Sequence, residues 1–257
     1  ATLNLSGPLV IGLEVQSDQL GSGLRTLNNA GTITDDKEKS MTFIGGINKG
    51  NSILLNLGLS SGASEIFYRN SLGYFGAKIG LILTYENGDI TGNYLLANNG
   101  TIDFHGDKSI GIQIFAQSYA TGLGPKVNVD NSGTISVAGA ESYGIKVSSR
   151  VDTANSSILN NGTINVSGSN ELTGGDGLSS GMAIIEDSDQ LGNPIVAGSI
   201  MKNNKIINVS GLGNSGMFLK TAVLGDVITN ATTGSINVSE NKNIGMRMDL
   251  GALVLTG

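Results

Sequence analysis

The sequence contains no cysteine, one histidine and few charged residues, and each shortage excludes a class of protein. Without cysteine there can be no disulfide, thiolate metal site or cysteine nucleophile. The single histidine, His105, excludes metal sites that need several imidazole ligands. Charged residues are 14% of the chain against a usual ~25%, and the net charge is −6, so nucleic acid is a poor partner. No apolar run of about 18 residues is present, so no transmembrane helix is predicted.

Glycine and asparagine are abundant instead, at 39 and 27 residues, while proline is limited to three. Low charge and high glycine content also occur in disordered chains. Here, however, 39% of the residues are hydrophobic and they recur periodically. This periodicity predicts a packed structure.

A first recurring motif is a glycine followed by alternating apolar residues, as in "YGIKV" at 143–147. Its copies place glycines at Gly12, Gly45, Gly73, Gly111, Gly144, Gly181, Gly216 and Gly245. The average repeat is about 33 residues, which is the sequence signature of a solenoid.

A second motif, "N-x-G-T-I-x-V", precedes the first. It begins at Asn29, Asn98, Asn131 and Asn160, with degenerate copies at 203–209 and 232–238. In four copies the third position of the motif precedes the next motif glycine by 11 residues: 100 to 111, 133 to 144, 205 to 216 and 234 to 245. So constant a spacing indicates a true structural repeat.

Each repeat holds three runs of about five residues with period-two alternation, which is typical of strands with one buried face. The sequence therefore predicts an all-β parallel β-helix of about eight coils, each of roughly 30–35 residues with three short strands. Equivalent apolar residues should stack in internal rows. The predicted rows are Ile33, Ile102, Ile135, Ile164, Ile207 and Ile236; Phe104, Val137, Val166, Val209 and Val238; and Ile112, Ile145, Met182, Met217 and Met246.

Five asparagines hold one position of the repeat: Asn29, Asn98, Asn131, Asn160 and Asn203. A ladder of side-chain amides, hydrogen-bonded along the axis, accounts for this recurrence. A row of ligand-binding side chains is the alternative.

The repeat is interrupted in several places. Residues 51–97 are predicted to form irregular coils rich in aromatic residues. Loop insertions are predicted at 168–180 and 186–194, and a long exit from a strand at 118–126. Insertions in a solenoid are extruded as loops, often on a binding face.

Candidate chemistry is sparse. His105 follows a strand, where an exposed polar residue is expected. Acidic residues gather at Asp35, Asp36 and Glu38 and again at Glu186, Asp187 and Asp189. A glycosidase needs two carboxylates about 5–10 Å apart, so a β-helical enzyme is an alternative, but solvated acidic turns are the ordinary interpretation.

Two further signals are weak. Residues 174–178, "GGDGL", resemble a calcium-binding nonapeptide but occur once, which favours a loop. The aromatic residues of 67–94 could stack on sugar rings, yet core packing is the commoner role. No cofactor, metal or catalytic residue is predicted, and no ligand-binding residue is identified.

The segments "LNNAGTIT", "LANNGTIDFHGDKSIGIQI", "NNGTINVSGSN" and "TTGSINVSENKNIGMRM" resemble passenger domains of bacterial autotransporters. They are most similar to the large outer-membrane autotransporter adhesins of fusobacteria. The resemblance covers residues 94–250 well, 1–50 loosely and 51–93 poorly. It implies a right-handed β-helix displayed on the bacterial surface, from a parent chain anchored by a C-terminal outer-membrane barrel.

The resulting hypothesis treats residues 1–257 as a single β-helix domain from a longer passenger, without the signal peptide or the barrel. Its expected function is adhesion, through loops on the rod, to a host cell-surface protein or glycan or to partner bacteria. A polysaccharide-processing lyase or glycosidase and a purely structural spacer are the alternatives.

Overall fold

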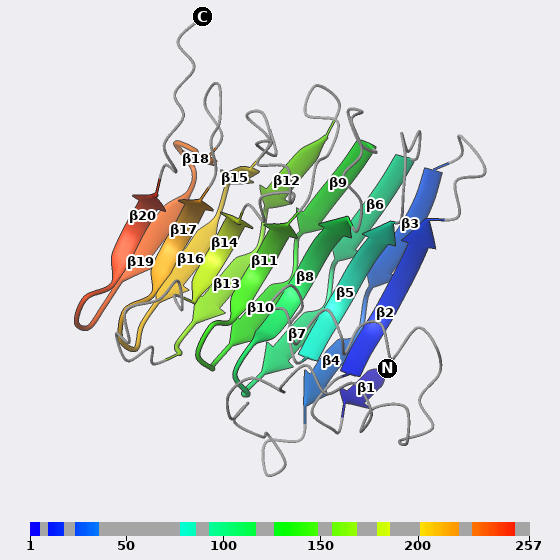
Figure 1. Ribbon diagram of the computed structural model, residues 1–257, viewed down its shortest axis with the longest axis horizontal. Coiled ribbons are helices and arrows are strands. Elements are labelled where there is room, and N and C mark those ends of the chain that lie inside the picture. Colours follow the sequence, from blue (N-terminus) through cyan, green and yellow to red (C-terminus); the bar gives the residue numbers. More distant parts are fainter. Residues whose placement is uncertain are drawn as a thin grey trace, which may run out of the picture.

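The computed structural model describes residues 1–5, 10–17, 24–35, 78–85, 93–116, 126–148, 156–168, 179–185, 201–220 and 228–249. Within these ranges the chain forms strands and no helix (Figure 1). No described segment is therefore a helix of the length and apolarity that a membrane crossing requires. The strands belong to three sheets, here named A, B and C.

Sheet A holds seven strands: β1 (Thr2–Leu5), β4 (Thr32–Asp35), β7 (Thr101–Phe104), β10 (Thr134–Val137), β13 (Thr163–Val166), β16 (Ile206–Val209) and β19 (Ser235–Val238). Sheet B also holds seven: β2 (Val10–Ser17), β5 (Lys78–Tyr85), β8 (Ser109–Ala116), β11 (Tyr143–Ser148), β14 (Ser180–Ile185), β17 (Ser215–Lys220) and β20 (Ile244–Met248). Sheet C holds six: β3 (Leu24–Asn29), β6 (Asn93–Asn98), β9 (Lys126–Asn131), β12 (Ser157–Asn160), β15 (Met201–Asn203) and β18 (Ile228–Asn230).

The chain visits the sheets in the order A, B, C and then starts again one strand further along each sheet. All the strand pairs are parallel, as between β10 and β13 in sheet A and between β11 and β14 in sheet B. One visit to the three sheets is one coil of a solenoid, as Figure 1 shows. The predicted all-β, parallel β-helical fold is confirmed.

The predicted number of eight coils is wrong, because sheets A and B hold seven strands each in the described residues. Two of the predicted coils were centred on Gly45 and Gly73. In the structure β2 pairs directly with β5, which places Ile11 opposite Ile79. The coil stacked on the first one is therefore built around Gly80, and residues 36–77 lie outside the described residues, between β4 and β5.

The region 51–97 was predicted to be irregular, but its described part is regular. Residues 78–85 form β5 and pair in register with β8, and residues 93–97 belong to β6, which pairs in register with β9. Residues 51–77 and 86–92 lie outside the described residues.

The core contains the three predicted rows, whose stacking is confirmed, together with inward residues of sheet C such as Leu96, Val129 and Ile158. Ile135 pairs with Ile102 on one side and Ile164 on the other, and Ile145 pairs in the same way with Ile112 and Met182. Nearly all these side chains are excluded from solvent and belong to one apolar cluster. Burial of this continuous cluster is the main force that holds the coils together.

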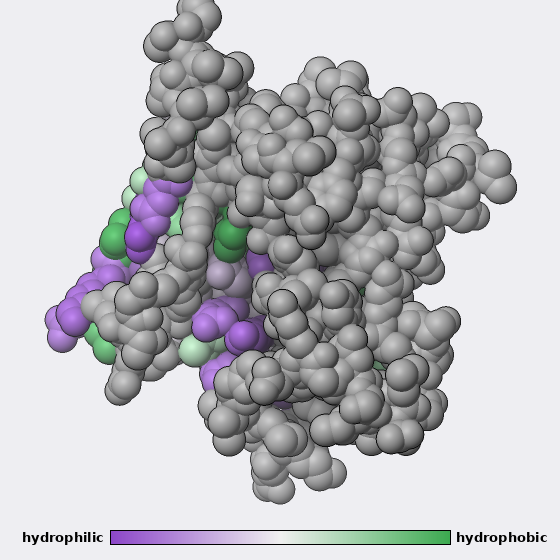
Figure 2. Space-filling view, viewed as in Figure 1, coloured by the Kyte–Doolittle hydropathy of each residue, from purple (hydrophilic) through white to green (hydrophobic). Residues whose placement is uncertain are grey.

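In the last described coil, residues of the internal rows are partly exposed. Val238, Met246 and Met248 continue the internal rows, yet they are 43%, 41% and 55% exposed. In Figure 2 this end of the solenoid shows apolar and polar patches side by side. The final coil therefore contributes less to stability than the inner coils.

The glycines of sheet B that are covered by a following coil stand where no side chain would fit. A Cβ atom at Gly144 would lie 2.5 Å from the carbonyl oxygen of Gly181 in the next coil and 2.6 Å from Cγ2 of Ile164. Similar contacts recur at Gly111, Gly181 and Gly216. Glycine is thus required because sheet B passes close to the isoleucine row of sheet A.

The predicted asparagine ladder is also present, at the corner between sheets C and A. Nδ2 of each asparagine donates to Oδ1 of the next at 2.7–2.8 Å, from Asn29 through Asn98, Asn131, Asn160 and Asn203 to Asn230. The four central rungs have no exposed surface. The amides therefore have a structural role, because they satisfy one another inside the solenoid.

A second amide ladder runs along the outer face of sheet A. Nδ2 of Asn208 donates to Oδ1 of Asn165 at 2.8 Å, and Nδ2 of Asn237 donates to Oδ1 of Asn208 at 2.9 Å. These residues are more exposed than the inner rungs. Hydrogen bonds that compete with water contribute less to stability than buried ones.

We expect Gly144→Ala to destabilise the fold by roughly 2–3 kcal/mol, because the new methyl group overlaps a backbone oxygen that cannot rotate away. Gly245→Ala is the matched control. Its Cβ would meet nothing closer than 3.8 Å, so its free energy of unfolding should change by less than about 0.5 kcal/mol. Urea denaturation followed by far-UV circular dichroism measures both, and equal effects would contradict the close-packing argument.

We expect Asn131→Ala to lower the free energy of unfolding by roughly 2–4 kcal/mol, because it strands a buried donor on Asn98 and a buried acceptor on Asn160. Asn237→Ala removes the same side chain from the exposed ladder and should cost less than about 1 kcal/mol. The same denaturation measurement compares the two. A loss no larger for Asn131 than for Asn237 would refute the role given to the buried ladder.

Candidate functional site

The cluster that departs most from the repeat is built around Asp35, the last residue of β4. Asp35 pairs with Leu5 of β1, and Thr34 pairs with Asp103 of β7, which places Asp35 beside Phe104. It thus occupies an inward position that holds apolar residues in the other coils. The side chain of Asp35 has no exposed surface. A carboxylate in such a place needs partners that replace water.

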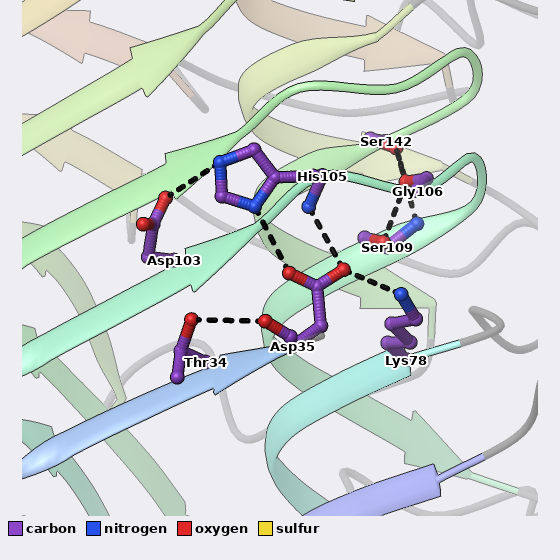
Figure 3. A network of polar contacts seen from close by, with 8 residues as sticks. All are labelled: Thr34, Asp35, Lys78, Asp103, His105, Gly106, Ser109 and Ser142. Carbon is purple, nitrogen blue, oxygen red and sulfur yellow. Dashed lines mark hydrogen bonds and ion pairs between the residues drawn. The ribbon is translucent and has the colours of Figure 1, made fainter. Parts of the chain in front are cut away.

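Two residues supply these partners, as Figure 3 shows. Nζ of Lys78, the first residue of β5, donates to Oδ2 of Asp35. The main-chain N–H of His105 donates to the same oxygen at 3.1 Å. Nδ1 of the His105 ring lies 2.9 Å from Oδ1, and because a carboxylate only accepts hydrogen bonds, this nitrogen carries the proton. Both oxygens of Asp35 are therefore occupied.

The charge of Asp35 is retained at neutral pH. Burial raises the pKa of its carboxyl group, but the hydrogen bonds from Lys78 and His105 and the positive charge of Lys78 outweigh burial. The net effect holds the pKa of Asp35 below its usual value of 3.8. Lys78 and Asp35 thus form an ion pair whose side chains are only 3% and 0% exposed.

His105 connects this buried pair to the surface. Its Nε2 lies 3.6 Å from Oδ1 of Asp103, whose side chain is 34% exposed, while the His105 side chain is 26% exposed. The cluster therefore runs outward from Lys78 and Asp35 through the imidazole to Asp103. Only its outer half is accessible to solvent.

Beside the cluster, serine side chains line the same corner between sheets A and B. The hydroxyl of Ser109 donates to the carbonyl of Gly106 at 2.6 Å, and the hydroxyl of Ser142 accepts from the N–H of Ser109 at 3.1 Å (Figure 3). Ser179 repeats this with Ser142 at 2.9 Å. All three are fully buried. Their hydroxyls support the corner and are not placed as nucleophiles.

The described cluster does not match the catalytic arrangements considered from the sequence. A glycosidase presents two carboxylates across a sugar, whereas both oxygens of Asp35 point into the protein. A nucleophile–His–Asp triad needs a hydroxyl at the free ring nitrogen, and Nε2 of His105 faces Asp103. In the described ranges no three His, Cys, Asp or Glu side chains form a metal site.

The structure changes the interpretation of two residues. His105 was predicted to be an exposed polar residue, but it is half-buried and bound to Asp35. Asp35 was assigned to a solvated acidic turn and is in fact buried. Tyr94 lies in the core, which agrees with the structural role preferred for it over sugar binding.

The other candidates lie largely outside the described residues. These are Asp36, Glu38, the acidic group at 186–189, the glycine-rich loop 174–178 and the loop 186–194. Of the loops 118–126 and 168–180, the structure describes only the flanking residues. Lys126 opens β9, Gly168 and Ser179 belong to the corner between β13 and β14, and Ser180 opens β14.

Lys78 was not singled out from the sequence, although a signal was present. Residues 31–35, "GTITD", align with "GTISV" at 133–137, so that Asp35 takes the place of Val137. An acidic residue in a core row requires a buried cation or proton donor nearby. Lys78, the first residue of β5, is that cation.

Comparisons of the chain with protein-family models, with curated proteins and with solved structures give no match in any of the three. The function must therefore be argued from the residues and their arrangement.

We expect Asp35→Val to lower the free energy of unfolding by roughly 3–5 kcal/mol, because the buried Lys78 ammonium loses the Asp35 carboxylate. The double variant Asp35→Val/Lys78→Ser carries a valine and a serine, as the equivalent positions Val137 and Ser109 do in other coils. The double variant should then be more stable than Asp35→Val alone by roughly 2–4 kcal/mol. Chemical denaturation of the three proteins tests this. A double variant no more stable than Asp35→Val alone would show that the two residues do not depend on each other.

Proposed function

We propose that this chain is a segment of a surface-displayed bacterial adhesin, a right-handed β-helical rod whose corner loops attach to a host cell-surface protein or glycan or to partner bacteria. The right-handed path follows the general rule for parallel strands joined by crossover connections. In this proposal the parent protein reaches the surface by the autotransporter route. The passenger-like motifs of the sequence support that assignment.

The observation that carries the proposal is the distribution of long connections among the three corners. Between sheets C and A the connections contain two to four residues in every coil, as at 30–31 and 132–133. Between sheets A and B they range from 105–108 to 167–179 and 36–77, and between B and C they reach 186–200. Variation confined to two edges of a rigid scaffold is typical of binding proteins.

The scaffold itself is suited to carry loops rather than to change shape. Its core rows, its glycine column and its buried amides each repeat from coil to coil. Such a solenoid places loops at fixed intervals of about 4.8 Å along an edge. Several weak contacts along that edge could act together on one extended partner.

A polysaccharide-processing enzyme on the same scaffold is the second candidate, and the acidic residues Asp187 and Asp189 motivate it. A spacer that holds a binding tip elsewhere in the parent chain is the third. The three differ in what the purified chain does by itself: it binds, it degrades a polysaccharide, or it does neither.

We expect the purified chain to bind cultured epithelial cells or a component of a glycan array, and a variant lacking residues 170–177 to bind at least five-fold more weakly. This deletion shortens the connection between β13 and β14 to the length found at 138–142. The solenoid should stay folded, because turns of that length already serve other coils. Circular dichroism and binding are measured on the same samples.

The Asn237→Ala variant is the matched control, because it alters an exposed residue on the face of sheet A away from the connection. If the folded deletion variant binds as well as the original chain, another loop must carry recognition. Polysaccharide turnover that is lost in Asp187→Asn would replace the adhesin proposal with the enzyme. Binding by the parent chain but not by this segment would favour the spacer.

A further inference from the structure

We propose that Lys78 and Asp35 react with each other to form an intramolecular amide bond, a covalent cross-link that joins the two ends of segment 36–77. The proposal is independent of the adhesin function. It assigns to the buried cluster a chemical role as a self-processing site, with the chain as its own substrate.

The first support is the contact between the two groups in a place shielded from solvent. Nζ of Lys78 touches the Asp35 carboxylate, and the two side chains are 3% and 0% exposed. In bulk water the solvent opposes amide formation from an amine and an acid. Burial removes that opposition, and fixed proximity makes the reaction intramolecular, which raises the effective concentration of the amine enormously.

The second support is the different environment of the two carboxylate oxygens. Oδ2 accepts the main-chain N–H of His105 at 3.1 Å, which would stabilise negative charge as the carboxyl carbon becomes tetrahedral. Oδ1 accepts the ring Nδ1–H of His105 at 2.9 Å, which can protonate a departing oxygen. One residue thus supplies an oxyanion donor to one oxygen and a proton donor to the other.

The reaction balances without any outside reagent. The Lys78 ammonium carries three protons and the amide nitrogen keeps one. The uncharged amine attacks the Asp35 carbonyl carbon and forms the new C–N bond, and the C–Oδ1 bond breaks. The other two protons leave with Oδ1 as one water molecule, and His105 relays one of them and returns to its starting state. The ion pair is the resting state, and its uncharged form, reached by proton transfer within the contact, is the reactive one.

The position of the pair in the chain means that the cross-link would stabilise the fold. Asp35 is the last residue before segment 36–77 and Lys78 is the first residue after it. In the next coil the corresponding places hold Phe104 and Ser109, which cannot form an amide with each other. A bond that closes a long loop reduces the entropy of the unfolded chain, and without cysteine this protein has no disulfide to do so.

Intact-mass spectrometry of the purified, folded chain tests the proposal. The expected mass is about 18 Da below the sequence mass, for one water lost, and it should be reached progressively after folding. Tandem mass spectrometry of a protease digest should then find one branched peptide that joins Asp35 to Lys78. A chain at full sequence mass after prolonged incubation, with no branched peptide, would overturn the proposal and leave a buried ion pair only.

Lys78→Arg is the matched variant, because it keeps the positive charge but cannot form the bond. It should stay at its full sequence mass. This control matters because cyclisation at Asp35-Asp36 also loses one water, and a loss that persists in Lys78→Arg would refute the cross-link. His105→Ala removes the ring and keeps the main-chain N–H, so the bond should form at least ten-fold more slowly. An unchanged rate in His105→Ala would overturn the catalytic part of the proposal.

Discussion

The distance of about 4.8 Å between neighbouring strands decides what each position of this repeat can hold. Because equivalent residues of successive coils stack at that distance, the neighbours of a side chain are copies of itself. Asparagine satisfies this condition since its amide both donates and accepts, as Asn131 does between Asn98 and Asn160. Glycine satisfies it where the carbonyl of the next coil occupies the space of a side chain, as at Gly144. The repeat in the sequence follows from this single distance.

A charged residue cannot satisfy the same condition by repetition, because stacked carboxylates would repel one another. Asp35 is therefore placed between Leu5 and Phe104 and is balanced from the side, by Lys78 and His105. The departures at positions 35 and 78 depend on each other. Both stand at the ends of segment 36–77, so the polar cluster lies where two successive described strands are furthest apart in the sequence.

The sequence was sufficient to predict the features that depend only on stacking. The rows of Ile135 and Ile145 and the ladder of Asn131 follow from register, and register can be read from the spacing of motifs. The number of coils could not be read in this way, because Gly45 and Gly73 match the motif while the strand that pairs with β2 is built around Gly80. Pairing is decided by contacts between distant segments, which a local motif does not encode. The cluster at Asp35 was missed although its departure from the core row was visible.

The corners explain why the solenoid accepts long connections in some places only. At the corner between sheets C and A, Nδ2 of Asn98 donates both to Oδ1 of Asn131 before the turn of the next coil and to the carbonyl of Thr134 after it, at 2.8 and 3.2 Å, so the two ends of that turn are held together. The turn at 231–234, which has four residues, keeps the same bond, from Asn203 to the carbonyl of Ser235 at 3.3 Å. At the corner between sheets A and B the polar residue stands after the turn. Ser179 follows the long connection of its coil and still bonds to Ser142 and to the carbonyl of Gly139, both at 2.9 Å. Lys78 stands in the same place after segment 36–77. An insertion that precedes the bonding residue leaves the corner intact, and this is the physical reason why long loops can be added at this edge without loss of the fold.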